Sequence, residues 1–442
     1  MSRFVRVSMV LATGLLAGLG VVMFHYALQV LRYVLMHLLG ISRLVSIAQT
    51  VSLGGSRLFL LPVVIFLGFA ISKFVATKSG ISHRRERGAD RIIEVVNGEE
   101  VALPMAEAMG TAVAGVVALG LGVSGGPEGP IAMLVGGPIV NLLSRFGIEE
   151  RQLRILVAAG VGSALATLFR APLAGVFLAG ELFVLEGFLG AVVLPGLLVA
   201  AITWFVGSTL IGNSPLIGHL SLGRLQPEAY LSAIVLGLGA GLVGLGYRWW
   251  VVVVGTRLTH LSRSRVLWWL AVAVVVSAIT SALALVVPEV LSTGSGWIRL
   301  VAAFGSDMTA FPLWLLLATP LARLVLTGLS LSAEAPVGVL GPALIIGAFS
   351  GAALWRLSTL VHLSATFGGA SLFALLMFAA VFGSIGRVPL SMVVIAIEAT
   401  GALAAAPLVM VSVGIAVFMV RQRGMTIFGS QALPGQSPIM PT

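Results

Sequence analysis

The chain has no cysteine and few charged residues, and each shortage excludes a class of protein. Without cysteine there can be no disulfide, thiolate metal site or cysteine nucleophile. Charged residues make up only 10% of the 442 residues, whereas soluble domains carry about 25%. So few charges cannot cover a water-facing surface, which excludes a large soluble domain, a nucleotide-binding module and a nucleic-acid reader.

Residue patterns that carry enzyme chemistry are also missing. The six histidines show no His-x-x-x-His spacing, and Asp90 and Asp307 are the only aspartates. No serine lies in a Gly-x-Ser-x-Gly context, and no glycine pattern of a nucleotide-binding loop follows a predicted strand. The sequence therefore predicts neither an enzyme nor a bound metal or cofactor.

Long apolar segments dominate the chain instead. Hydrophobic residues make up 58% of it, and the mean hydropathy is +1.10. We expect a first membrane helix within 7–39 rather than a cleaved signal peptide, because the apolar run is too long. Further segments of spanning or near-spanning length lie at 57–76, 101–125, 128–146, 152–169, 188–212, 230–254, 266–288, 310–328, 342–361, 371–384 and 389–420. The fold class predicted is an all-α polytopic membrane protein.

The net charge of +10 comes from clusters of arginine and lysine at 3–6, 73–87, 257–265 and 421–423. In membrane proteins such clusters mark cytoplasmic loops, so we expect both termini in the cytoplasm and the chain in the inner or plasma membrane. The polar stretch 212–230 carries one basic residue, Arg224, and is expected on the opposite side. A positive charge of this origin does not imply a nucleic-acid partner.

Many of the chain's 54 glycines and 19 prolines fall inside or at the edges of the apolar segments. Helices must therefore begin and end at membrane depth, which is tolerated only where the freed backbone is buried in protein or lines a cavity. Interrupted helices of this kind are typical of transporters.

One motif occurs in both halves of the chain. Arg170–Leu173 precedes Glu181, and Arg387–Leu390 precedes Glu398, with nine residues from proline to glutamate in each half. A Gly-Pro pair lies 42 residues upstream of the first motif's proline and 47 upstream of the second. Chance recurrence in a glycine-rich chain is the alternative to duplication. Duplication predicts two related halves, often inverted in the membrane, with a binding site where their helices meet.

The repeated glutamates and arginines have an expected structural role. Glu181 and Glu398 should accept hydrogen bonds from backbone amides at helix ends. Arg170 and Arg387 should donate to carbonyl groups near helix ends.

Two glycine-rich turns are candidate anion sites. Gly125–Pro130, the first cradle, opens an apolar helix whose first N–H groups have no internal partner and can hold an anion. Glu128 would take the anion's place when ionised and leave it when protonated, which makes it a candidate gate. The alternative is that Glu128 only complements the helix dipole. Gly338–Pro342, the second cradle, repeats the arrangement, so the two cradles are expected to share one site.

These motifs resemble those of the CLC family of chloride channels and proton-coupled chloride transporters. Gly126–Pro130 is similar to the family's G-[K/R]-E-G-P, and Gly338–Pro342 is similar to its G-x-F-x-P. Phe169–Glu181 resembles its N-A-P-L-A-G helix with the following glutamate, and Thr426–Pro438 resembles the C-terminal segment of bacterial members. The resemblance implies a homodimer in membrane lipid with one pore per subunit, and chloride or a similar small anion as substrate.

The resemblance also implies the domain organisation. One transmembrane domain would cover 1–442 as a CLC-type inverted repeat with many tilted and broken helices. The first repeat is expected at about 57–212 and the second at about 266–420. No C-terminal regulatory domain is expected.

The resemblance gives Glu128 the role of gating glutamate. The implied anion-binding positions are Arg87, Gly88, Gly126, Pro127, Gly129, Val339, Leu340, Gly341 and Phe428. Four of these positions depart from the family pattern. Pro127 replaces a basic residue, and Leu340 replaces a phenylalanine. Arg87 replaces a serine, and Phe428 replaces a tyrosine.

A further departure concerns proton transfer. Family antiporters usually carry a second glutamate directly after the position of Glu181, and here that residue is Leu182. We therefore expect passive anion transport, with proton-coupled antiport as the alternative. Glu186, four residues beyond Leu182, is the residue that could restore coupling.

Overall fold

The computed structural model describes residues 3–40, 56–80, 88–98, 102–183, 189–220, 222, 225–255, 257–259, 266–294, 296, 311–360, 362 and 368–421. Within these ranges the chain is helical. The principal helices are α1 (Arg3–Leu38), α2 (Leu61–Lys78), α3 (Ala89–Asn97), α4 (Met105–Gly120), α5 (Glu128–Leu143), α6 (Glu150–Leu168), α7 (Ala174–Glu181), α8 (Leu189–Ile211), α9 (Ala229–Trp249), α11 (Val266–Val286), α13 (Leu313–Ser332), α14 (Leu340–Leu360), α16 (Ala370–Gly386), α17 (Pro389–Thr400) and α18 (Ala406–Arg421).

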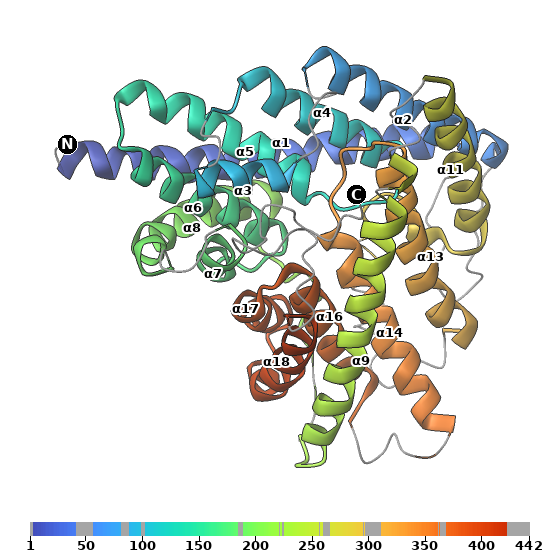
Figure 1. Cartoon of the computed structure of the whole chain (residues 1–442). Helices are drawn as coiled ribbons and strands as arrows, with labels where there is room; N and C mark the ends of the chain where they lie inside the picture. The colour runs from blue at the N-terminus through green and yellow to red at the C-terminus, as the bar shows by residue number, and fades with distance from the viewer. Residues whose placement is uncertain are drawn as a thin grey trace.

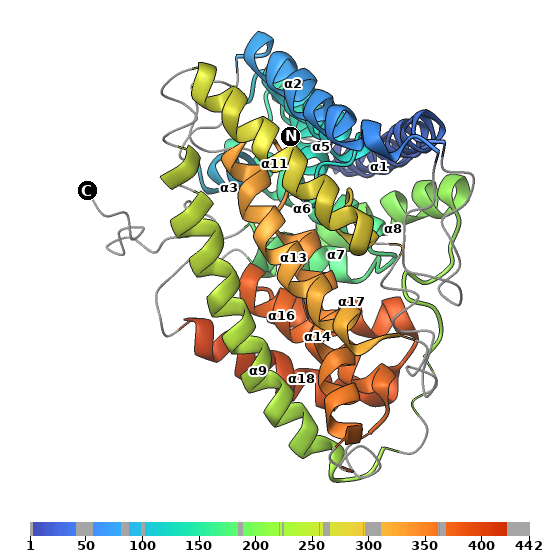
Figure 2. The same ribbon diagram turned by 90° about the vertical axis from the view of Figure 1, so that its right-hand side faces the viewer.

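The helices form two groups that meet at the centre of the molecule. Helices α1 to α8 occupy the upper and left part of Figure 1, and α9 to α18 occupy the right and lower part. Helix α11 packs against α2, as Figure 2 also shows, and α7 packs against α17, so helices of the two groups are in contact. The turns that precede α5 and α14 lie between these groups.

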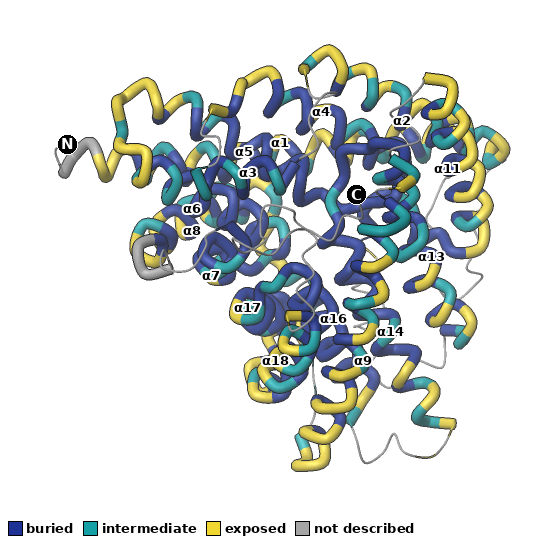
Figure 3. Tube along the Cα trace, viewed as in Figure 1, coloured by how far each residue is buried: buried dark blue, intermediate teal, exposed yellow. Residues whose placement is uncertain are grey.

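Among the described residues, nine helices are long and apolar enough to cross a membrane. The core of the helix bundle is buried, whereas the outer faces of peripheral helices are exposed (Figure 3). These outer faces carry large apolar side chains, including Leu194 and Phe205 on α8 and Leu267 on α11. A water-facing surface would not be built from such side chains, so these faces fit a hydrocarbon environment.

Glycine pairs bring the long helices of each group close together. Gly14 and Gly18 on α1 face α8, where a Cβ on Gly18 would lie 2.6 Å from the Cβ of Val206. Gly237 and Gly241 on α9 face α18 in the same way. The Gly-x-x-x-Gly spacing places both small residues on one helix face and lets the backbones approach closely.

The predicted all-α polytopic fold is confirmed, with one correction to its helices. The segment 389–420, expected as a single span, is divided into α17 and α18. Gly401 adopts a φ of 68°, in the left-handed region, and this conformation ends α17.

Candidate functional site

The two cradles are joined by direct backbone pairing. The N–H of Gly126 donates to the carbonyl of Gly338 at 2.7 Å, and the N–H of Gly338 donates to the carbonyl of Gly126 at 2.7 Å. Helix α5 begins two residues after Gly126, and α14 begins two residues after Gly338. The two cradles therefore lie together, well within the diameter of one helix, about 10 Å, as a shared site requires.

Glu128 lies at this junction, and its side chain is directed into the second cradle. The residue is 1% exposed, and neither carboxylate oxygen has a well-aligned hydrogen bond in the described structure. A Cβ on Gly126 or Gly338 would overlap the carboxylate, and a Cβ on Gly341 would lie 2.6 Å from Oε1. The backbone amides nearest the carboxylate are those of Glu128, Leu340 and Gly341. The glycines therefore make the space that the carboxylate occupies at the N-terminus of α14.

A third helix N-terminus reaches the same place. Gly88 immediately precedes α3 with a φ of 62°, and a Cβ on it would lie 2.8 Å from the Cα of Gly129. The close approach and the positive φ both require glycine here. Gly88 was expected as an anion-binding position, and that role remains a prediction, while Arg87 lies outside the described residues.

Two buried side chains on other helices support the cradles, and the sequence analysis missed both. Tyr247 on α9 donates its hydroxyl to the carbonyl of Val339 at 2.7 Å. Arg323 on α13 donates to Ser124 Oγ at 2.9 Å and to the carbonyl of Ser292 at 2.8 Å. Arg323 is fully buried and its charge acts on Glu128. A lone charged residue inside an apolar span was the signal that could have identified Arg323.

Glu289 is a second buried carboxylate near this network. It lies in a short 3-10 helix, Pro288–Val290, and is fully buried. Arg323 holds this segment through the carbonyl of Val290 at 2.5 Å. Neither Glu289 carboxylate oxygen has a hydrogen-bond partner in the described structure, and burial raises the pKa of Glu289 to about 7.

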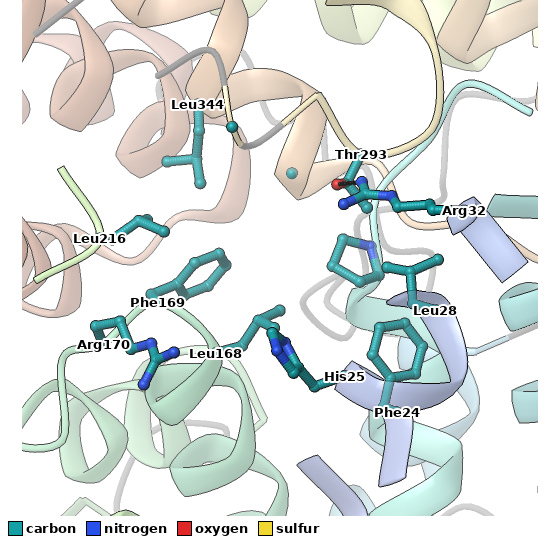
Figure 4. A pocket seen from close by; sticks show the side chains of 13 residues that line it. Phe24, His25, Leu28, Arg32, Leu168, Phe169, Arg170, Leu216, Thr293 and Leu344 are labelled. Atoms are coloured by element: carbon teal, nitrogen blue, oxygen red, sulfur yellow. Dashed lines mark hydrogen bonds between the residues drawn. The ribbon is translucent and has the colours of Figure 1, made fainter. Parts of the chain in front are cut away.

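A cavity of about 260 Å³ lies next to the cradles (Figure 4). Pro127 and Gly341 contribute one residue from each cradle to its wall. The cavity is also lined by His25 and Arg32 from α1 and by Arg170 from the end of α6, as the figure shows. Basic side chains from other helices thus stand near the position where Pro127 replaces the family's basic residue.

The repeated glutamates cap helices in the opposite half. Glu181 accepts from the N–H of Leu390 at 2.9 Å and from the N–H of Ser391 at 2.8 Å, at the start of α17. Glu398 accepts from the N–H groups of Leu173 and Ala174, both at 3.1 Å, at the start of α7. The structural role predicted for both glutamates is confirmed, and the two caps are reciprocal.

The paired arginines share a backbone conformation but differ in their contacts. Arg170 and Arg387 have φ values of 58° and 57°. Arg170 donates to the carbonyl of Ile211 at the end of α8 at 3.3 Å, as predicted. The prediction for Arg387 is wrong, because its guanidinium donates to no described residue and its Nε is buried without a partner.

Leu182, at the position of the missing proton acceptor, is buried in apolar surroundings. Glu186 and Phe428 lie outside the described residues, so the predicted roles of both remain predictions. Among the side chains that the structure describes, no group of three His, Asp or Glu residues is placed to hold a metal ion.

The fold and this junction define a multi-pass membrane protein whose interrupted helices meet at a buried glutamate. The family model described as voltage gated chloride channel matches residues 63–421. The chain belongs to this family, the CLC family.

Curated relatives and solved structures agree with this assignment. The H(+)/Cl(-) exchange transporter ClcA of Salmonella arizonae is 26% identical over 267 residues, covering 57% of this chain and 54% of that protein. ClcA of Klebsiella pneumoniae is 26% identical over 251 residues, covering 54% and 50%. The chain thus matches about half the length of these relatives.

Two crystal structures share the fold. A slow cyanobacterial Cl-/H+ antiporter has a TM-score of 0.80 at 20% identity, with 95% of both chains covered. A CLC-type fluoride/proton antiporter has a TM-score of 0.76 at 21% identity, with 98% of this chain and 99% of that chain covered.

Proposed function

We propose that this chain carries chloride or a similar small anion across a membrane, along a pathway gated by Glu128. The observation that carries the proposal is the Glu128 carboxylate, buried where the N-termini of α5 and α14 meet. Helix N-termini attract anions, so an ionised carboxylate and a diffusing anion compete for the same place. Protonation removes the charge of Glu128 and lets the anion enter.

The anion-binding positions follow from the same geometry. Gly126, Pro127 and Gly129 would surround the anion from the first cradle. The second cradle would surround the anion with Val339, Leu340 and Gly341. Their backbone amides would donate hydrogen bonds, and the apolar side chains would exclude water. Gly88 would complete the pathway on the side of α3. Arg87 and Phe428 are further anion-binding positions that the family resemblance implies.

Proton-coupled exchange is the form of transport that we favour. The matching relatives are named H(+)/Cl(-) exchange transporters, which supports the antiporter reading over the expected passive one. Passive conduction is the second candidate, because Leu182 is buried and apolar and cannot carry a proton. Coupled exchange therefore requires that water or Glu186 bring protons to Glu128 past Leu182.

Anion flux into proteoliposomes tests the gate. Glu128→Gln has nearly the shape of the protonated residue, so we expect flux that is faster than that of the wild type at neutral pH and nearly independent of pH. The wild type should accelerate as pH falls. The matched control is Glu149→Gln, an exposed residue that makes no side-chain cap at the start of α6. Unchanged flux and unchanged pH response in Glu128→Gln would contradict the gate.

A second measurement separates exchange from passive conduction. A chloride gradient is imposed across proteoliposomes with no proton gradient, and the pH of the medium is followed. Coupled exchange moves protons uphill at a fixed ratio to chloride, and passive conduction does not. If coupling is found, Glu186→Gln should reduce proton movement more than chloride movement, since Leu182 offers no proton-carrying group.

We also propose that the protein is a homodimer in the inner or plasma membrane, with both termini in the cytoplasm. Each subunit would have one domain over 1–442, with repeats near 57–212 and 266–420. The family resemblance and the arginine clusters support this arrangement. Because the chain has no cysteine, single-cysteine variants can be labelled from either side. Arg257→Cys should react from the cytoplasm and Glu228→Cys from the opposite side, since both residues are exposed. Labelling of both from one side would contradict the topology.

A further inference from the structure

Arg248 on α9 is a buried cation that the polypeptide does not neutralise. The residue is 1% exposed, and its Nε, Nη1 and Nη2 are all buried without a hydrogen-bond partner in the described structure. A guanidinium stays charged, and an unpaired buried charge costs several kcal/mol. A group other than the described protein residues must therefore neutralise the charge of Arg248.

Two other fully buried arginines show what a satisfied guanidinium looks like in this fold. Arg91 donates to Glu94 at 2.9 Å and to Glu107 at 3.2 Å. Arg323 donates to one hydroxyl and two carbonyl groups. Both form several hydrogen bonds to protein groups, so the isolation of Arg248 is not a general property of arginines in this core.

A second arginine, Arg387, adds to the positive potential at Arg248. The Nε of Arg387 is also buried without a partner. No ion pair joins an acidic side chain to either arginine in the described structure. Two neighbouring like charges without an acid between them attract an anion.

The residues that precede these two arginines contact the second cradle. Tyr247, which precedes Arg248, bonds to the carbonyl of Val339. A Cβ on Gly386, which precedes Arg387, would lie 3.3 Å from the side chain of Leu340. The backbone of both arginines therefore lies near the place where α14 begins.

Another pair of arginines, Arg32 and Arg170, lies in the other half of the molecule. Arg170 matches Arg387 in motif and in backbone φ. Arg32 lies on α1, which packs on α8 through glycines as α9 packs on α18. Arg32 and Arg170 line the cavity of Figure 4, whereas Arg248 and Arg387 do not. The Arg248 and Arg387 pair is therefore separate from the pair in that cavity, where Arg32 already donates to Ser292 and Thr293.

We propose that Arg248 and Arg387 form a binding site for one small monovalent anion such as chloride, beside the second cradle and separate from the cavity of Figure 4. Arg248 is 1% exposed, so a bound group would be enclosed by protein, which favours a small ion over a phosphate ester. This inference rests on the proposed anion transport, because the two arginines would form an additional binding site for the transported ion.

Binding is tested with bromide, whose anomalous scattering locates it in crystals. We expect a peak beside Arg248 in the wild type and none in Arg248→Met. The matched control is Arg257→Met, an exposed residue shortly beyond α9, which should keep the peak. Bromide at the cradles with none beside Arg248 in the wild type would overturn the proposal.

Thermal unfolding in detergent separates an anion site from a structural arginine. In gluconate without chloride, Arg248→Met should be at least as stable as the wild type, because removing an unpaired buried charge is not costly. Added chloride should stabilise the wild type and Arg257→Met but have less effect on Arg248→Met. Loss of stability in gluconate, with the chloride effect intact, would assign Arg248 a structural role and overturn the site.

Flux measurements connect the site to transport. Arg248→Met should raise the chloride concentration for half-maximal flux about tenfold, the size expected for one charge-assisted hydrogen bond, and Arg248→Lys should restore part of it. An unchanged half-maximal concentration would contradict a site on the pathway. A bromide peak beside Arg248 in a protein that transports no anion would uphold the site and refute the proposed function.

Discussion

Gly338→Ala is the sharpest test of how Glu128 is held. A Cβ at this position would overlap the Glu128 carboxylate and would lie 3.2 Å from the Glu128 backbone nitrogen. The backbone cannot retreat easily, because Gly338 is paired to Gly126 by two 2.7 Å hydrogen bonds. The side chain of Glu128 should therefore leave its buried position.

The magnitude follows from the cost of overpacking, typically about 1–3 kcal/mol. A cost of about 2 kcal/mol shifts the ratio of occupied to vacated cradle about 30-fold. We expect anion flux in proteoliposomes to rise at neutral pH, where the wild-type carboxylate competes with the anion, and its dependence on pH to weaken. Gly239→Ala is the control, because nothing lies within 4 Å of a Cβ on that helical glycine.

The double variant decides whether the effect passes through Glu128. On a Glu128→Ala background the overlapping carboxylate is gone, so Gly338→Ala should change the flux little. An equal change of flux on both backgrounds, or wild-type flux and pH response in the single variant, would refute the reasoning. Size-exclusion profiles and melting temperatures verify that each variant is folded.

Three further predictions concern stability in detergent. Glu398→Ala should lower the free energy of unfolding by about 1–3 kcal/mol, because two amides at the start of α7 lose their acceptor, and equal melting of variant and wild type would contradict the cap. Tyr247→Phe should cost a similar amount by leaving the Val339 carbonyl unpaired, and a melting temperature as high as that of the wild type would exclude this role. Glu289 has a raised pKa of about 7 and should contribute stability below pH 4.5 that is lost as pH rises through 7, by about 3 kcal/mol in total. Glu289→Gln should flatten this profile between pH 5 and 8, and an unchanged slope would assign it to other groups.

Most of what could be predicted about the site from the sequence came from the motifs that recur in the two halves. Matching motifs placed Gly126 and Gly338 in equivalent positions, and the structure joins them by hydrogen bonds. The reciprocal caps of Glu181 and Glu398 were also foreseeable as structural contacts, although their partners in the opposite half were not. Equal spacing in two halves predicts equivalence but does not specify which helix end meets which side chain.

Residues outside the repeated motifs were harder to predict. Tyr247 and Arg323 each stand alone in an apolar helix, and only the packing of α9 and α13 brings them to the cradles. The expected carbonyl contact of Arg387 failed because a shared backbone conformation does not determine where a long side chain ends. The break at Gly401 was missed because an apolar run of spanning length conceals a single left-handed glycine.

The crossed contacts of Glu181 and Glu398 have a consequence for the origin of the chain. Each half provides one glutamate and one helix N-terminus, and each of these groups finds its partner only in the other half. One half alone would leave both its carboxylate and its amide groups without partners. Two identical copies related by a twofold axis would satisfy each other completely. A single ancestral segment could therefore have folded as a symmetric pair before gene duplication joined the two copies in one polypeptide.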